Sequence, residues 1–530
     1  SAAGAGDMGA VKSVTTDDDV AHSDTNVRTA DVDEGDIVKT DGKYIYQYFT
    51  SGEVRIIAIN DGQMEKVSTI DVSGGYDTYV SEMYVKDDRL VLISDVYESS
   101  LENDKEEVYY YRVNDSETVH VMTYDISDRE NPRSLGEVTI DGNYRTSRLV
   151  DGYLYVMSTY GQPLYYLYDY DINYVEGDTT YALDGVIPKI NGTKIAAEDI
   201  MIPEKAKNEP FYTITSIKLT DPTKVVDTKS VMGYVDQVYA STGSLFFYSQ
   251  EWNGKYDHTQ IVKFSYKDGK ITPEAAGSVR GYVDDSFCID EDSDGNLRVA
   301  TTTWSDDGSQ ESSLFILDKD MKKIGSLKDI AGNEGIKSCR FMGDIGYIVT
   351  FRNTDPLFTV DLSDPTNPTI LSELTIPGFS EYLHYWGDGL LLGIGYDADI
   401  DDGGTTGVKL SMFDVSDPKN TKEVAKLSLD VDNSDVLYGN YKSILIDPSK
   451  NLLGFTASDW GDEDNDWEEK NYYMLFSYED GEFRELKTKK LDGYTDNVRG
   501  IYAGDYFYLV NDKHIVSYDM DGYKKVAEID

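Results

Sequence analysis

One unit of four β-rich runs recurs along this chain and constrains its fold more than any other feature. In the clearest copy, residues 336–376, turn sequences separate the runs at Gly343-Asp344 and at Asp361-Leu362-Ser363-Asp364-Pro365. Both are typical of tight turns, because Gly and Asp tolerate left-handed backbone and Pro presets φ. The third run ends in the same way at residues 125–128 and 414–418. The unit is therefore a set of four strands joined by hairpins.

Nine such units follow one another, and units of this length are the blades of a β-propeller. Their approximate bounds are 32–74, 79–142, 143–233, 234–281, 282–332, 334–378, 379–430, 433–493 and 494–530. We therefore predict an all-β fold, a β-propeller of four-stranded antiparallel blades with eight or nine blades. Unit 433–493 is the least regular and the first candidate for a miscount. A pair of β-sandwiches would explain the strands but not the repeated turns.

The repeat also divides the chain. Residues 25–530 are predicted to form a single β-propeller domain, closed by packing of the first blade against the last, with residues 25–35 as a strap. Residues 1–24 are polar, and we interpret them as a flexible leader after a removed signal or anchor, whose deletion should leave the melting temperature unchanged. A long insertion at 160–210 separates the second and third strands of its unit. It is either a lid packed by its own side chains or an aromatic platform facing a ligand.

Shorter acidic insertions lie between the same two strands of other units, at 97–114, 397–407 and 459–470. One side of the ring is therefore expected to be acidic and rich in loops. The formal net charge of the chain is −49. Such a field repels nucleic acid and anionic membranes and attracts cations, so we expect no nucleic-acid partner. No run of apolar residues is long enough for a membrane-spanning helix.

The sharpest candidate for a metal site lies in the fifth unit. Asp290, Asp292 and Asp294 alternate just before Gly295. This spacing lets three carboxylates converge on one Ca²⁺ while the glycine permits the turn. An EF-hand would need Glu at the position of Thr301, so we expect a calcium-binding hairpin loop instead. The alternative is a polar hairpin tip without metal.

Motifs of catalysis are absent from the sequence. It contains no nucleophile elbow, phosphate loop or dinucleotide fingerprint, and we assign no catalytic residues. His384 is interpreted as a satisfied core or rim histidine. Cys288 and Cys339 stand at the starts of consecutive units, where they are either two buried thiols, which we favour, or a disulfide.

Several stretches resemble a family of secreted bacterial and archaeal proteins with a C-terminal β-propeller domain. They are residues 31–46, 297–302, 340–365 and 376–384. The resemblance extends over about residues 25–530 and implies an exported or envelope-anchored protein. It supplies no catalytic residues.

Together these observations favour a secreted or envelope-anchored binding or scaffold propeller of unknown ligand, stabilised by Ca²⁺ if the Asp290 loop binds it. We expect a monomer whose partner is an extracellular protein or a glycan. The alternative is a cell-surface enzyme acting on polysaccharide or peptide, using two of the 98 Asp and Glu side chains.

Overall fold

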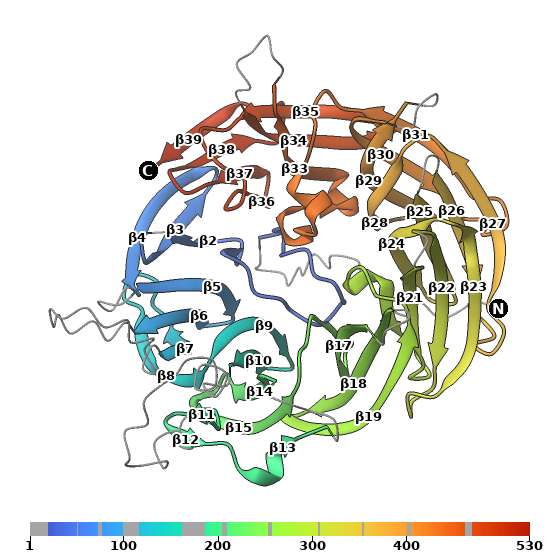
Figure 1. Cartoon of the computed structure of the whole chain (residues 1–530). Coiled ribbons are helices and arrows are strands. Elements are labelled where there is room, and N and C mark those ends of the chain that lie inside the picture. Colours follow the sequence, from blue (N-terminus) through green and yellow to red (C-terminus); the bar gives the residue numbers. More distant parts are fainter. Residues whose placement is uncertain are drawn as a thin grey trace, which may run out of the picture.

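The computed structural model shows a ring of nine antiparallel sheets around a central axis (Figure 1), which confirms the β-propeller and sets the number of blades at nine. Unit 433–493 is a true blade. The structure describes residues 20–49, 51–72, 77–98, 116–161, 186–203, 209–252, 257–305, 308–351, 355–399, 404–461 and 469–530.

The first four blades hold the strands β1 to β19. Blade 1 has β1 (Val38–Thr40), β2 (Tyr44–Phe49), β3 (Glu53–Asn60) and β4 (Gln63–Asp71). Blade 2 has β5 (Asp77–Lys86), β6 (Arg89–Glu98), β7 (Ser116–Asp125) and β8 (Arg133–Asp141), extended by β11 (Lys189–Ile190) and β12 (Thr193–Lys194). Blade 3 has β9 (Asn143–Val150), β10 (Tyr153–Tyr160), β14 (Phe211–Lys218) and β15 (Asp221–Met232), extended by β13 (Ile200–Met201) after the 3₁₀ helix η1 (Ala197–Asp199). Blade 4 has β16 (Gln237–Ala240), β17 (Ser244–Trp252), β18 (Asp257–Lys267) and β19 (Lys270–Arg280).

The remaining five blades follow in chain order. Blade 5 has η2 (Ser286–Cys288), β20 (Ile289–Glu291), β21 (Leu297–Trp304), β22 (Gln310–Leu317) and β23 (Lys323–Gly332). Blade 6 has β24 (Gly335–Met342), β25 (Ile345–Phe351), β26 (Asp355–Asp361) and β27 (Thr369–Ile376). Blade 7 has β28 (Phe379–Gly387), β29 (Leu390–Ala398), β30 (Thr405–Asp414) and β31 (Lys422–Ser428). Blade 8 follows η3 (Asp435–Tyr438) and η4 (Tyr441–Ser443) and has β32 (Leu445–Asp447), η5 (Pro448–Lys450), β33 (Leu452–Asp459), β34 (Lys470–Glu479) and β35 (Glu482–Lys490). Blade 9 has β36 (Arg499–Ala503), β37 (Tyr506–Val510), β38 (Ile515–Asp519) and β39 (Lys525–Ile529).

Burial along the strands follows from their place in a blade. The second strand β33 is buried at every position but its last, because both of its faces pack against neighbouring blades. The fourth strand β35 mixes exposed and half-buried residues, since it lies at the outer rim. Apolar clusters lie between adjacent blades around the ring. Within the described residues, no helix has the length and apolarity that crossing a bilayer requires.

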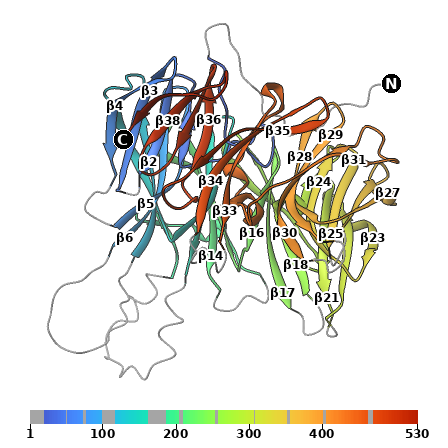
Figure 2. The same ribbon diagram turned by 90° about the horizontal axis from the view of Figure 1, so that it is seen from above.

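The ring closes by packing of blade 1 against blade 9, as predicted, and each of these blades is built from its own four strands. Ile45 and Ile57 share one apolar cluster with Tyr508 and Ile515. Hydrogen bonds also cross the junction, for example from Ser517 Oγ to the carbonyl oxygen of Gly62 at 2.6 Å. Figure 2 shows the two terminal blades, in blue and red, side by side.

Residues 21–36, which we name the channel segment, run along the inner wall of the ring before β1 (Figure 1). They contact blades 9, 7, 5, 4, 3 and 2 in turn, so residues 25–35 tie blades together as a strap. The hydrogen bonds are Ser23 N to Tyr502 O, Asn26 Nδ2 to Tyr382 Oη, Arg28 Nη2 to Ile289 O, Thr29 Oγ1 to Ala240 O, Asp33 N to Leu149 O and Asp36 N to Met83 O.

Hydrogen bonds to blade 9 already begin at Ala21 and Ser23, within residues 1–24, which the sequence predicted to be a flexible leader. Gly504 N donates to the carbonyl oxygen of Ala21 at 2.7 Å, and Ser23 N donates to that of Tyr502 at 3.0 Å. Ser23 is buried. Residues 1–19 lie outside the described residues.

The described part of the 160–210 insertion lies at the outer edges of two blades. Ile190 of β11 pairs with Ile140 of β8, and β13 pairs in parallel with β15. This part of the insertion therefore covers the edge strands of blades 2 and 3. Its Tyr-rich half, residues 162–185, and most of the acidic insertions lie outside the described residues.

The recurring Asp-x-Ser-Asp sequence forms the same turn in three blades. Asp125, Asp361 and Asp414 each accept a hydrogen bond from the backbone N–H two residues later, at 2.9–3.0 Å. These bonds stabilise the charged carboxylate. The backbone bond is the main cause that lowers the pKa of Asp125 to about 2. The pKa values of Asp361 and Asp414 are also lowered, most by the hydroxyls of Ser363 and Ser416 and next by the backbone N–H groups.

These turns should make the propeller sensitive to acid. A carboxyl whose pKa is lowered by folding stabilises the protein above its unfolded pKa, and that stability is lost as the pH falls through the folded pKa. We expect Asp414→Asn to melt below the wild type at about pH 6, and the difference to shrink as the pH falls below about 4, the ordinary pKa of an aspartate. Melting curves across this range measure the effect. Asp521→Asn, at an exposed turn, serves as the control, and a constant difference for Asp414→Asn would contradict the prediction.

Candidate functional site

One face of the ring carries both the loops between second and third strands and the connections between blades, because the strands of each blade alternate in direction. We name it the insertion face. In the described ranges, the strongly exposed Tyr and Trp side chains all lie on this face, either in a blade connection or at an end of a strand that meets it. They are Tyr79, Tyr97, Tyr234, Trp252, Trp304, Tyr438, Trp460 and Tyr494. Exposed aromatic side chains confined to one face make that face the first candidate for a binding surface.

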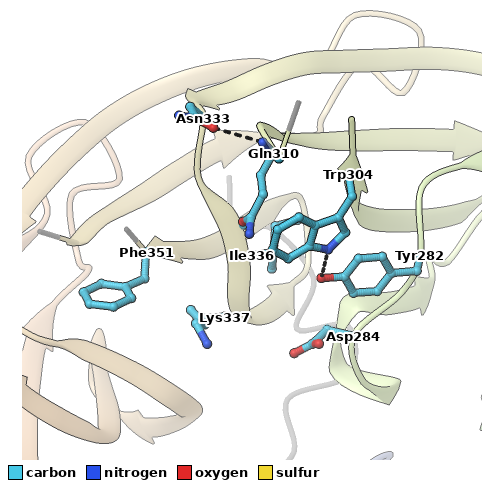
Figure 3. A pocket seen from close by; sticks show the side chains of 10 residues that line it. Tyr282, Asp284, Trp304, Gln310, Asn333, Ile336, Lys337 and Phe351 are labelled. Atoms are coloured by element: carbon cyan, nitrogen blue, oxygen red, sulfur yellow. Dashed lines mark hydrogen bonds between the residues drawn. The ribbon is translucent and has the colours of Figure 1, made fainter. Parts of the chain in front are cut away.

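A pocket of about 370 Å³ opens on this face between blades 5 and 6 (Figure 3). Its walls come from the blade connections before β20 and β24 and from the ends of β21 and β25 that meet the insertion face. The lining residues are Tyr282, Asp284, Trp304, Gly308, Gln310, Asn333, Gly335, Ile336, Lys337 and Phe351. We name it the Trp304 pocket. Its volume is typical of small-molecule sites.

Aromatic rings stand on two sides of the Trp304 pocket. The indole of Trp304 is 43% exposed, and its Nε1 donates to Tyr282 Oη at 3.2 Å. Phe351 lies across the space, with Lys337 and Asp284 between (Figure 3). The rings therefore offer flat apolar surfaces close to polar groups.

Backbone contacts hold the polar wall of the pocket in place. Asn333 Oδ1 accepts a hydrogen bond from the backbone N–H of Gln310 at 3.0 Å. A Cβ at Gly335 would lie 2.2 Å from Gln310 Oε1, so a glycine at this position leaves room for the amide of Gln310.

Two acidic side chains have pKa values shifted toward neutral pH: Asp284 in the lining of the pocket, and Glu381, which contacts the lining residue Lys337. Burial, with help from Asp285, raises the pKa of Asp284 to about 6. Burial raises the pKa of Glu381 to about 7, although Lys337 Nζ lies 3.3 Å from Glu381 Oε1 and opposes the shift. Groups with such pKa values exchange protons near neutral pH.

Buried ion pairs line the central channel, and the channel segment runs along its wall. Glu34 is 1% exposed and accepts a hydrogen bond from Tyr441 Oη at 2.7 Å. Burial raises its pKa, but Arg148 and Lys442 outweigh burial, so the pKa is lowered overall. The charges in this part of the channel are thus paired within the protein, and the Trp304 pocket is the better candidate for a ligand.

The structure gives each residue of the predicted calcium loop a different environment. Asp290 is buried and forms an ion pair with Arg298 Nη2 at 2.5 Å. Asp292 accepts hydrogen bonds from the backbone N–H groups of Asp294 and Asn296 at 2.9 Å, and Asp294 is exposed. In the described part of the chain, no group of three His, Cys, Asp or Glu side chains is placed to hold a metal ion.

Calcium binding at this loop stays a prediction with a direct test. A ligand that binds only the folded protein raises its melting temperature. If the loop binds Ca²⁺, calcium should raise the melting temperature of the wild type relative to chelator but not that of Asp292→Ala. An equal shift in both proteins would place the cation elsewhere, and no shift in either would make the loop a polar hairpin tip.

The two cysteines are free, buried thiols, as we favoured from the sequence. Their sulfur atoms lie 3.2 Å apart, so blades 5 and 6 approach more closely here than the sequence suggested. His384 is also buried, and its Nδ1 lies 3.0 Å from Tyr382 Oη. Burial lowers the pKa of His384 to about 3, so it is a neutral core side chain, as predicted, but within the described residues its buried Nε2 has no hydrogen-bond partner, so the ring is only partly satisfied.

Sequence reasoning missed the Trp304 pocket, although one signal was present. Trp252 and Trp304 end the second strands of consecutive blades, and Trp460 directly follows the second strand of blade 8. Exposed tryptophans that recur where the second strand meets the following loop indicate that this end of the blades is a candidate binding surface. The partners of Trp304 come from separate connections, which no local pattern brings together.

The comparisons with known proteins agree with the fold. An uncharacterized protein of Archaeoglobus fulgidus is 29% identical, over 98% of this chain and 86% of its own length. The uncharacterized protein MJ1554 of Methanocaldococcus jannaschii is 26% identical, over 96% of this chain and 83% of its own length.

Among solved structures, Saccharomyces cerevisiae Sqt1 is similar at 11% identity and a TM-score of 0.38, over 78% of this chain and 92% of that one. This likeness is too low to bear on activity. The model of the beta propeller domain family matches residues 22–523, from the channel segment to the last blade. The chain therefore belongs to the beta propeller domain family.

Proposed function

We propose that the protein is a carbohydrate-binding propeller and that the Trp304 pocket holds a sugar unit. The observation that carries this proposal is the exposed indole of Trp304 beside polar groups that can bind hydroxyls. A sugar ring offers an apolar face and a rim of hydroxyl groups. The first suits an aromatic ring, and the second suits the side chains of Gln310, Asp284 and Lys337.

The same features argue for binding ahead of catalysis. Trp304 and Phe351 provide flat apolar surfaces, and Asn333 and Gln310 provide amides, while the channel segment occupies part of the inner wall of the ring. The expected location, secreted or on the outer side of the cell envelope, rests on the sequence resemblance and is part of the proposal.

A second candidate function is hydrolysis of a polysaccharide at this site. The raised pKa of Asp284, which lines the pocket, favours it, since a general acid must be protonated near the working pH. Asp284 would then be the acid, and Asp284→Asn would abolish hydrolysis.

A glycan array combined with a hydrolysis screen tests both functions. We expect the wild type to bind a set of glycans without cleaving them, and Trp304→Ala to lose about fivefold in affinity, because stacking on an aromatic ring contributes on the order of 1 kcal/mol. Trp252→Ala is the matched control, since its indole ends the same strand of the neighbouring blade but does not line the pocket.

The possible outcomes separate the proposals. Equal losses in the two tryptophan variants would show that the pocket is not the site. Cleavage that disappears in Asp284→Asn would replace binding by hydrolysis as the function. A protein that binds no glycan would refute the carbohydrate proposal.

A further inference from the structure

A second pocket, of about 480 Å³, lies on the insertion face next to the Trp304 pocket. Its lining residues are Arg145, Thr146, Arg148, Tyr212, Tyr234, Val235, Asp236, Gln237, Val238, Ser286 and Tyr441. The connection between β19 and η2 separates the two pockets. Asp284 lines the first, and Gln237 of the second donates from Nε2 to the carbonyl oxygen of Asp284 at 3.0 Å. The pockets are thus neighbours that share one wall.

The lining of this second pocket contains two arginines and one aspartate, whereas that of the first contains one lysine and one aspartate. Arg145 is exposed at the beginning of β9, and its Nε donates to Thr159 Oγ1 at 2.9 Å. Arg148 is buried, with Nη1 bound to the carbonyl oxygen of Ser147 at 2.6 Å and Nε 3.8 Å from Glu34 Oε1. Among the described residues, Arg145 has no ion pair with a carboxylate.

The remaining charged and titratable groups leave the Arg145 side of the pocket positive. Asp236 is the carboxylate in the lining, and its Oδ2 accepts a hydrogen bond from the backbone N–H of Gln250 at 2.7 Å. Burial raises the pKa of Tyr212, and the charges of Arg145 and Arg148 oppose this shift, so both guanidinium groups lie near its hydroxyl. Tyr441 is bound to Glu34.

Two arginines against one aspartate in the lining make this pocket stand out in a chain with a net charge of −49. Salt screens exposed charges beyond about 8 Å at physiological ionic strength, so the nearest groups decide what enters. A guanidinium group binds a carboxylate through two parallel hydrogen bonds. The exposed ring of Tyr234, 66% accessible, stands at the same pocket and can stack on a sugar.

We propose that this pocket is an anion subsite that binds the carboxylate of an acidic sugar unit, next to the unit held in the Trp304 pocket. The inference rests on the proposed carbohydrate-binding function and names the class of ligand: an oligosaccharide in which a uronic acid is adjacent to a neutral sugar. Arg145 contacts the carboxylate, and Tyr234 contacts the ring of the same unit. Arg148 is buried and forms the base of the pocket.

The test is calorimetric titration with cellobiose and with the matching disaccharide that carries one glucuronic acid. We expect the wild type to bind the acidic disaccharide at least about tenfold more tightly than cellobiose, with a preference that shrinks at high salt. Arg145→Gln should bring this ratio close to one. Arg133→Gln removes an exposed arginine from β8, outside both pockets, and should keep the ratio of the wild type.

The remaining outcomes overturn the inference or separate it from the proposed function. Equal affinity of the wild type for the two disaccharides, or an unchanged ratio in Arg145→Gln, would refute the anion subsite while leaving the Trp304 pocket intact. Sodium glucuronate alone serves as a second probe. If its binding depends on Arg145 but not on Trp304, the anion subsite stands even where the carbohydrate proposal for the Trp304 pocket fails.

Discussion

Asp36→Ala is expected to destabilise the propeller by about 3–5 kcal/mol, because it leaves a buried guanidinium group without its carboxylate. Arg499 Nη2 lies 2.9 Å from Asp36 Oδ1, and Arg499 Nε lies 3.0 Å from Asp36 Oδ2. Both side chains are buried. The pair joins the end of the channel segment to β36 and therefore crosses the closure of the ring. Chemical denaturation with a single transition measures the change.

A double variant separates this ion pair from general damage to the core. Asp36→Leu combined with Arg499→Met removes both charges, so no unpaired charge stays buried, and we expect it to be clearly more stable than Asp36→Ala. If the double variant is as unstable as Asp36→Ala, or if Asp36→Ala unfolds like the wild type, the ion pair does not stabilise the closure.

The second large effect is expected from shortening the chain at its N-terminal end. A protein lacking residues 1–29 loses the hydrogen bonds of Ser23, Asn26, Arg28 and Thr29 to four blades. A hydrogen bond contributes about 0.5–1.5 kcal/mol, and one made by a charged group contributes more. We therefore expect a loss of several kcal/mol and a melting temperature lower by at least several degrees.

The reference for this experiment is a chain that lacks residues 1–19 only. A chain lacking residues 1–24 should fall between the two, because it loses the pairing of Ala21 and Ser23 with blade 9 but keeps Arg28. This replaces the expectation, drawn from the sequence, that deletion of residues 1–24 has no effect. Equal melting temperatures for all three proteins would show that the channel segment does not stabilise the ring.

The fold could be predicted from the sequence because its signals are local. Asp361, Ser363 and Asp364 form hydrogen bonds within their own turn, so the sequence of that turn predicts its structure wherever it recurs. The bounds of the nine units match the nine sheets for the same reason. Only the number of blades stayed open, since the long connection through η3 and η4 made the eighth unit irregular.

The candidate site could not be predicted, because its parts are distant in the chain or depend on neighbours. Asp290 was expected to bind Ca²⁺ on the spacing of three aspartates, but the structure places Arg298 and Arg28 beside its carboxylate. In an acidic chain, alternating carboxylates are common, and the sequence does not show which of them face cations of the protein itself.

The sequence by itself determined the propeller, its blades and the chemistry of its repeated turns, because each depends on residues within one hairpin. Tertiary structure alone decided how the ring is tied and where it can bind. Asp36 meets Arg499 across the whole length of the chain, and Tyr282, Trp304 and Lys337 meet at one pocket from two blades. Contacts of this kind follow from the closure of the ring, which brings distant residues together without leaving a pattern in the sequence around them.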